Sequence, residues 1–173
     1  MKADLPHPRS AAFLLAQVGA HAAARFAERL AVLQLTPAHA GTMRIIHASS
    51  GISQQALSST LGLVPSRLVA LVDELEERGL VERRDSPGDR RAHALHLTRK
   101  GVETLEAIGR IARAHDDAIC EALTAGERET LAALLRRIAD QQGLTPGVHP
   151  GFSRLGRSRE AAEGVPRKKG GRR

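Results

Sequence analysis

Residues 54–78 have the sequence QQALSSTLGLVPSRLVALVDELEER, which contains two runs with the apolar spacing of short amphipathic helices. The apolar positions recur three and four residues apart, at Leu57, Leu61, Leu68, Leu71, Val72 and Leu75. Gly62 lies between the runs, where a glycine lets the backbone turn sharply at low steric cost. Pro65 stands where the first turn of a helix tolerates a missing N–H. The stretch therefore predicts a helix-turn-helix.

A basic hairpin is expected directly after these helices, in residues 80–97 (LVERRDSPGDRRAHALHL). Leu95 and Leu97 alternate with His96 as on a half-buried strand, and residues 86–88 supply turn-forming serine, proline and glycine. A helix-turn-helix followed by such a hairpin is a winged helix. Four arginines cluster on the hairpin, at Arg83, Arg84, Arg90 and Arg91. This positive charge favours contact with phosphates; the alternative is a small α+β unit that binds no nucleic acid.

The sequence resembles the MarR family of bacterial transcriptional regulators in LGLVPSRLVALVDELEERGLVER (residues 61–83) and DRRAHALHLTRKG (residues 89–101). These segments are similar to that family's recognition helix, its wing and the start of the following helix. The resemblance covers about residues 10–142 and is strongest over residues 52–101. It implies a transcriptional regulator, expected to be a repressor, that binds double-stranded DNA as a homodimer. A small molecule or a redox signal is expected to change its DNA affinity.

Side chains at the start of the recognition helix are expected to reach base edges in the major groove, where Arg67 can pair bidentately with guanine. On the hairpin, Asp89 and Arg91 match the family's D-x-R pattern, in which the arginine enters the minor groove and the aspartate holds it. The alternative there is a surface ion pair worth about 0–1 kcal/mol. The predicted DNA contacts are Ser53, Gln54, Ser66, Arg67, Val69, Ala70, Arg84, Asp89, Arg90 and Arg91.

The second half of the recognition helix is acidic. Its carboxylates would repel phosphate, so we expect them to point away from DNA; they are Asp73, Glu74, Glu76 and Glu77. Val64 occupies the N-cap position of this helix, where its side chain cannot accept a hydrogen bond. The helix therefore needs another acceptor at its start.

Amphipathic helices are predicted on both sides of the winged unit. Apolar positions continue at helical spacing from residue 15 to residue 33, which favours a helix over a secretion signal. Threonines provide N-caps at Thr36, Thr98 and Thr124, the last in a capping box with Glu127. The terminal helices have more apolar surface than a small winged unit can cover, which predicts an isologous dimer.

These features predict a mainly α fold with a small β-hairpin wing: a winged helix-turn-helix domain plus terminal dimerisation helices. The expected division is a flexible N-terminus (1–9), dimerisation helices (10–35 and 99–142), a winged helix-turn-helix DNA-binding region (36–98) and a basic disordered tail (143–173). The net charge is +7, but residues 145–173 hold eight Lys or Arg and only two Glu. The tail either follows DNA phosphates outside the core site or only aids solubility.

The resemblance implies an effector site between the dimer helices and the winged unit, near Phe26, His39, Met43 and His47. A small aromatic or anionic ligand there would bias the distance between the two recognition helices. The eight histidines lack close H-x-x-x-H pairing, so neither a metal site nor a cofactor is predicted. Cys120 lies near no predicted helix N-terminus, which disfavours a redox switch. The alternatives are a redox- or metal-responsive regulator and a winged helix that contacts only proteins.

Other classes of protein find little support in the sequence. It contains no glycine-rich phosphate loop, no G-x-S-x-G and no H-E-x-x-H motif, so no enzymatic activity is predicted. No stretch approaches the roughly 20 apolar residues of a membrane span. One cysteine in 173 residues fits a reducing cytosol. We therefore expect a cytoplasmic, nucleoid-associated protein.

Overall fold

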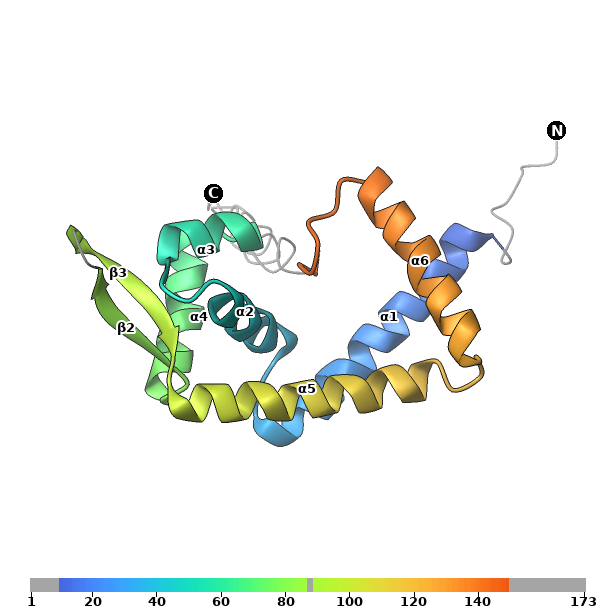
Figure 1. Ribbon diagram of the computed structural model, residues 1–173, viewed down its shortest axis with the longest axis horizontal. Coiled ribbons are helices and arrows are strands. Elements are labelled where there is room, and N and C mark those ends of the chain that lie inside the picture. The colour runs from blue at the N-terminus through green and yellow to red at the C-terminus, as the bar shows by residue number, and fades with distance from the viewer. Residues whose placement is uncertain (1–9, 87–88, 150–173) are drawn as a thin grey trace, which may run out of the picture.

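The computed structural model describes residues 10–86 and 89–149, with no side chains described for residues 86–93. In chain order the described residues form α1 (Ala11–Leu30), η1 (Ala31–Leu33), α2 (Pro37–Ala48), β1 (Ile52–Ser53), α3 (Gln54–Leu61), α4 (Pro65–Glu77), β2 (Val81–Ser86), β3 (Asp89–Leu97), α5 (Arg99–Ile119) and α6 (Ala125–Gln141). Figure 1 shows α2, α3, α4 and the strands gathered at one end of the long helix α5. The predicted mainly α fold with a hairpin wing is confirmed.

The predicted threonine caps are all present. The Thr98 hydroxyl accepts a backbone N–H of α5 at 3.0 Å. At α6, Thr124 Oγ1 accepts the Glu127 N–H at 3.4 Å, and Glu127 accepts the Thr124 N–H at 2.8 Å, which completes the predicted capping box. At α2 the returning acceptor is an imidazole, since His39 Nδ1 accepts the Thr36 N–H at 3.2 Å. These bonds satisfy amides that a helix leaves unpaired at its start.

The helix-turn-helix bends by 111° between α3 and α4. Gly62 makes the turn with φ at +63°, in the left-handed region that glycine adopts without a steric penalty. The strands form one antiparallel sheet in the order β1-β3-β2, in which Ile52 of β1 lies opposite Leu95 of β3. The sequence did not predict the two-residue strand β1. The predicted turn residues Pro87 and Gly88 lie outside the described residues.

The hydrophobic core is aliphatic and is built mainly from the winged unit. Its largest fully buried apolar side chains are Leu30, Met43, Ile46, Leu57, Leu61, Leu68, Val72, Leu75, Leu80, Val81 and Leu95. Five of the six apolar positions predicted from residues 54–78 belong to the core, and Leu71 packs against it partly buried. Burying each such side chain stabilises the fold by about 1.5–3 kcal/mol. Leu30 of α1 and Ile108 of α5 belong to the same cluster, so these two helices are anchored to the winged unit.

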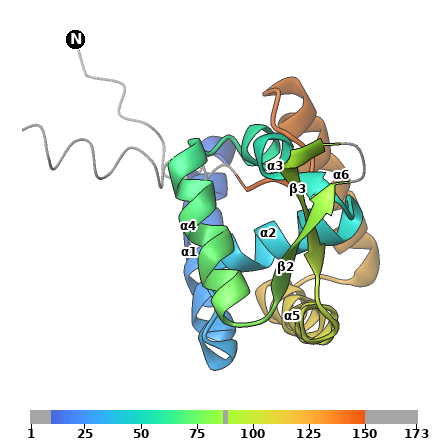
Figure 2. The same cartoon turned by 90° about the vertical axis from the view of Figure 1, so that its left-hand side faces the viewer.

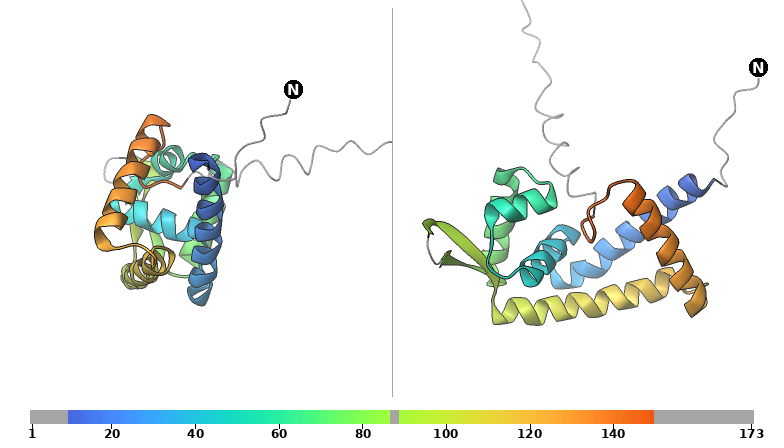
Figure 3. Two further views of the ribbon diagram at one scale, coloured as in Figure 1. Left: turned by 90° about the vertical axis from the view of Figure 1, so that its right-hand side faces the viewer. Right: turned by 45° about the horizontal axis from the view of Figure 1, so that its top comes forward.

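The terminal helices leave apolar faces uncovered in the single chain. Their exposed large apolar side chains are Phe13, Leu14, Leu15 and Val18 in α1 and Leu131, Leu134, Leu135 and Ile138 in α6. Helix α6 buries none of its side chains. Figure 3 shows α6 and the N-terminal end of α1 at the end of α5 that lies away from the winged unit. Within residues 10–86 and 89–149, no single helix could span a membrane, and α3 with α4 meets the length and composition requirement only as a bent pair.

Candidate nucleic-acid interface

The N-terminal half of α4 presents a row of accessible side chains. Ser66, Val69 and Ala70 are exposed, and Arg67 is half-buried. The Arg67 guanidinium forms no ion pair with any residue in the described ranges. A groove of about 580 Å³ lies beside this row, between α3 and α4. Figure 2 shows α4 and the wing on the same face of the molecule, so this row and the hairpin could approach one duplex together.

Arg83 of β2 neutralises much of the acidic half of α4. Its guanidinium binds Asp73 through Nη2 at 2.5 Å and Glu76 through Nη1, and its backbone N–H donates to Glu76 Oε1 at 3.3 Å. The Arg83 side chain is only 19% exposed, so solvent screens these pairs less than surface pairs. From the sequence we included Arg83 in the basic cluster expected to contact phosphate. The structure corrects that interpretation, because the Arg83 guanidinium already forms ion pairs with two carboxylates.

The start of α3 is joined to the same arginine. With its amide oxygen turned toward Arg83, Gln54 accepts Nε–H at 2.8 Å and Nη2–H at 3.1 Å. Ser53 Oγ accepts a backbone N–H of α3 at 3.1 Å as its N-cap. Both residues were predicted to touch DNA, and both have intramolecular partners here. Arg84 is 59% exposed and pairs with Glu82 of its own strand at 2.5 Å, so its guanidinium remains accessible from solvent.

The tip of the wing carries the remaining predicted contacts. Asp89, Arg90 and Arg91 belong to β3, and Asp89 lies opposite Ser86 where the register between β2 and β3 shifts. The side chains of these three residues lie outside the described part of the chain. Their assignment to DNA therefore stays a prediction.

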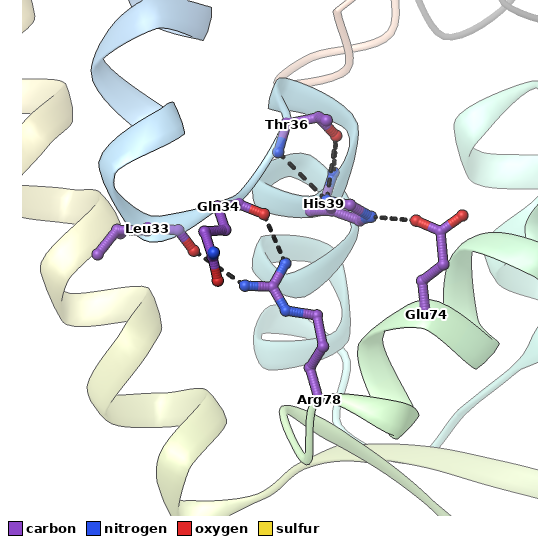
Figure 4. Close-up of polar contacts among 6 residues, drawn as sticks. All are labelled: Leu33, Gln34, Thr36, His39, Glu74 and Arg78. Carbon is purple, nitrogen blue, oxygen red and sulfur yellow. Dashed lines mark hydrogen bonds and ion pairs between the residues drawn. The ribbon is translucent and has the colours of Figure 1, made fainter.

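Two side chains of α4 and its cap, Glu74 and Arg78, contact α2 and the connection between α1 and α2 (Figure 4). Arg78, at the C-terminal cap of α4, donates from Nη1 to the Gln34 carbonyl at 2.7 Å and from Nη2 to the Leu33 carbonyl at 2.9 Å. One turn earlier, Glu74 binds His39 Nε2 at 2.9 Å. Because His39 Nδ1 accepts an N–H at the start of α2, its Nε2 is the nitrogen that donates to Glu74. The orientation of α4 thus depends on the His39 side chain of α2 and on backbone carbonyls of the segment that precedes α2.

Known proteins are similar to this chain over most of its described length. The proposed transcriptional regulatory protein for the hcr operon of Thauera aromatica is 38% identical over 112 residues, which are 65% of this chain and 68% of that relative. The MarR family profile matches residues 33–92. The chain belongs to the MarR family. Members of this family are transcriptional regulators and not enzymes.

Solved MarR structures confirm the winged helix-turn-helix fold. The transcriptional repressor CouR bound to a 23-mer DNA duplex is 35% identical, with a TM-score of 0.67 over 75% of this chain and 92% of CouR. A MarR variant from E. coli complexed with operator DNA is 26% identical, with a TM-score of 0.63 over 72% and 90% of the two chains. A MarR family protein of Mycobacterium tuberculosis in complex with salicylic acid is 25% identical, with a TM-score of 0.62 over 75% and 96%.

A largely apolar cavity of about 600 Å³ lies between α1, α2 and α5 of this MarR protein, and Gly147 and His149, which follow α6, also line it. Phe26 of α1 lines it together with Ala40 and Arg44 of α2 and Ile108 and Ala112 of α5. The volume falls within the range of about 300–1,000 Å³ that is typical of small-molecule sites. One arginine in an apolar wall suits a ligand with an apolar body and a negative charge.

The structure brings only Phe26 of the four predicted effector residues to this cavity. Met43 is fully buried in the core, the buried His39 holds α4, and His47 is exposed. Pro37, Ala40, Gly41 and Arg44 of α2 line the cavity. Ala40 and Arg44 follow His39 and Met43 by one residue, a rotation of about 100° on a helix. Helix α2, which carries three of the predicted residues, therefore lines this cavity through a neighbouring face, and the assignment of an effector to it stays a prediction.

Two other candidate sensors, His115 and Cys120, lie in the last turns of α5 and at its C-terminal cap. The His115 ring packs against Phe26 with ring centroids 5.3 Å apart. Burial, and secondly the Arg29 guanidinium, lower the pKa of His115, which favours a neutral imidazole. Cys120, at the C-terminal cap of α5, is partly buried. No group of three His, Cys, Asp or Glu side chains placed to hold a metal ion occurs in residues 10–86 or 89–149.

Proposed function

We propose that this MarR family regulator represses transcription by binding a pseudopalindromic operator as a homodimer. The contrast along α4 carries the proposal: its N-terminal half is accessible, while carboxylates of its C-terminal half are paired within the winged unit. The similarity to CouR, a repressor whose structure was solved on a DNA duplex, supports repression through DNA binding. Operator binding would place the protein on chromosomal DNA in the cytoplasm.

The start of α4 would read the major groove. Arg67 reaches a base edge in this proposal, and Ser66, Val69 and Ala70 add short-range contacts. No side chain caps α4 at Val64, so a phosphate oxygen can accept the Ser66 N–H at the start of the helix. Arg91 enters the adjacent minor groove, where it senses groove width more than base identity.

The uncovered faces of α1 and α6 would form the dimer interface. A C2 dimer buries the same surface on both subunits, and no side chain of α6 is buried in the single chain. Two recognition helices on one face of a duplex enter successive major grooves, so the half-sites should lie about one helical turn apart.

Alanine at Arg91 and alanine at Arg67 should weaken operator binding in different ways. Arg91→Ala should cost about 1–3 kcal/mol of binding free energy, with the largest loss on operators that have A·T steps at the flanks. Arg67→Ala should relax preference at one base pair in each half-site. Asp89→Ala should have a weaker form of the Arg91→Ala effect, because it frees the arginine without removing it. Salt titrations of affinity on matched and flank-altered duplexes measure all three effects.

Arg113→Ala is the matched control, since it removes one exposed arginine from α5, away from α4 and the wing. It should change affinity by less than any of the three variants. If Arg91→Ala left affinity unchanged while Arg67→Ala abolished binding to every sequence alike, the wing would not contact DNA. A fragment selection from genomic DNA would supply the operator and point to the regulated genes.

A small aromatic or anionic effector would bind in the cavity lined by Phe26 and Arg44. Phe26 and Ala112 offer apolar contacts there, and Arg44, which also donates to the Gly147 carbonyl at the cavity wall, offers a charge. The cavity borders the connection that Arg78 and His39 hold to α4, so a ligand has a physical route to the recognition helix. The complex of the M. tuberculosis relative with salicylic acid supports this chemistry. By linkage, a ligand that lowers DNA affinity must bind less tightly to the DNA-bound protein.

Filling the cavity should remove the response to effector. In the native chain we expect salicylate to raise the melting temperature and to weaken operator binding. Ala112→Phe places a ring in the cavity and should abolish both effects, whereas Ala114→Phe, at an exposed position of the same helix, should preserve them. Melting curves and DNA titrations with salicylate test this. If neither salicylate nor any compound of a broad metabolite panel shifts both quantities, the regulator is constitutive.

A further inference from the structure

The chain returns to the winged unit after α6. Residues 143–149, here called the C-terminal strap, turn back from the end of α6 toward α2 and α3 (Figure 1). The reversal is built by Gly143, whose φ of +65° is in the left-handed region, and by a bond from the Leu144 N–H to the Ala139 carbonyl at 3.0 Å. A glycine-based helix end of this kind sets the direction of the chain that follows it.

Two contacts seat the strap on the winged unit. Arg44 of α2 donates from Nη2 to the Gly147 carbonyl oxygen. Val148 packs against the hydrophobic core, and its N–H donates to the Thr145 carbonyl at 3.1 Å. A polar contact and an apolar contact together fix both the position and the direction of the strap.

The strap ends at the edge of the groove that carries predicted DNA contacts. A hollow of about 220 Å³ is lined by Ser59 and Gly62 on one side and by strap residues, including Val148 and His149, on the other. Ser59 and Gly62 also line the groove between α3 and α4. The chain beyond His149 therefore starts beside the helix-turn-helix and not at the end of α6.

The sequence that follows is strongly basic. Residues 150–173 contain eight Lys or Arg and two Glu, whereas the rest of the chain is nearly neutral. At roughly 3.3 Å per extended residue, this length allows a reach of up to about 80 Å, more than two turns of a duplex. Tethering to a DNA-bound domain holds such charges near phosphate at an effective concentration in the millimolar range, and each phosphate contact releases counterions.

We propose that the strap delivers the basic tail, residues 150–173, to the phosphates that flank the operator, as a second DNA contact independent of sequence. The inference rests on the operator binding proposed above and adds a contact outside the two half-sites. The place of the strap matters: without its seat on α2, the tail would be tethered at the end of α6, beside the proposed dimer interface.

The test compares two duplexes, the operator alone and the operator extended by about two helical turns at each end. Removal of residues 150–173 should weaken binding to the extended duplex by ~tenfold or more at about 0.1 M salt and lower the salt slope by roughly 0.9 for each lost phosphate contact. Binding to the short duplex should change much less. A tail with all eight Lys and Arg replaced by Gln should behave like the truncation, and a scrambled tail like the native chain.

Arg44→Ala tests the strap itself, because it keeps the tail but removes its polar anchor; Arg113→Ala is the control for the lost charge. The native chain should bind the extended duplex more tightly than the operator alone. Arg44→Ala should reduce this difference in affinity, and Arg113→Ala should not. Equal affinities and salt slopes of the full and truncated chains on the extended duplex would overturn the tail contact. If Arg44→Ala kept the native difference in affinity between the two duplexes, the strap would not position the tail. If the full chain binds neither duplex, operator binding itself fails.

Discussion

Replacing Gly101 by alanine should cost on the order of 3 kcal/mol of folding free energy, more than the helix propensity of alanine can return. Gly101 lies in the first turn of α5, where an added Cβ would stand 2.0 Å from the Leu80 carbonyl oxygen and 3.0 Å from its carbon. That carbonyl cannot move freely, because it accepts the Thr98 N–H at 3.1 Å while the Leu80 N–H donates to Leu75 at 2.9 Å. Relief of the clash must displace the backbone between α4 and β2.

Gly109→Ala is the matched control for this effect. It lies in the same helix, and the nearest atom to its added Cβ is Arg113 Nη1 at 3.6 Å, the end of a flexible side chain. Gly109→Ala should therefore be neutral or stabilise the fold by up to about 1 kcal/mol. Urea and thermal unfolding of both variants give the comparison. Equal midpoints would mean that the first turn of α5 does not pack closely against the Leu80 carbonyl.

Features of the fold that depend only on residues close together in the sequence were predicted correctly. Apolar positions three and four residues apart identified the buried faces of α3 and α4, because a helix with one such stripe must turn it to the core. The hydroxyls of Thr36, Thr98 and Thr124 marked three helix starts correctly, since an N-cap bond involves only residues a turn apart. Strand β1 was missed because two residues are too few to show an alternating pattern.

Contacts between distant elements were not predictable in the same way. Arg83 stood in a basic cluster that suggested phosphate, yet the fold places its guanidinium between Asp73 and Glu76 of α4. Asp73 and Glu76 are three residues apart and so could be predicted to share one face of α4. The sequence does not show that β2 brings Arg83 to that face. The contact between His39 and Glu74 could not be predicted for the same reason, because it joins residues that are 35 positions apart in the sequence.

The same limit applies to the candidate sites. The exposure of Ser66, Val69 and Ala70 agrees with their predicted place at the start of the recognition helix, but their contacts with bases stay predictions. For the proposed effector site, the resemblance suggested helix α2. Which residues of α2 line the cavity depends on which face of that helix packs against the core of the winged unit. Met43 faces that core, which leaves Arg44 toward the cavity.

Aspartate at both Leu134 and Ile138 should convert the homodimer into a monomer and lower operator affinity by about 100-fold or more. These side chains are 48% and 45% exposed in the single chain and lie one turn apart on α6. In the proposed dimer they are buried, and an unpaired carboxylate in an apolar interface costs several kcal/mol. A monomer also loses the second half-site, and joining two binding events raises affinity by about 10²–10⁴.

The variant should keep its fold and its half-site binding, because no residue of α6 belongs to the core of the winged unit. Sedimentation at micromolar concentration, circular dichroism and titrations on whole and half operators separate these effects. Val32→Asp is the control: it places a carboxylate at an apolar side chain that is 77% exposed in η1, outside the proposed interface, and should leave a dimer. If the double variant still sediments as a dimer, the subunits meet through another surface. If the native chain is a monomer that binds the whole operator tightly, the uncovered stripe of α6 has a different partner.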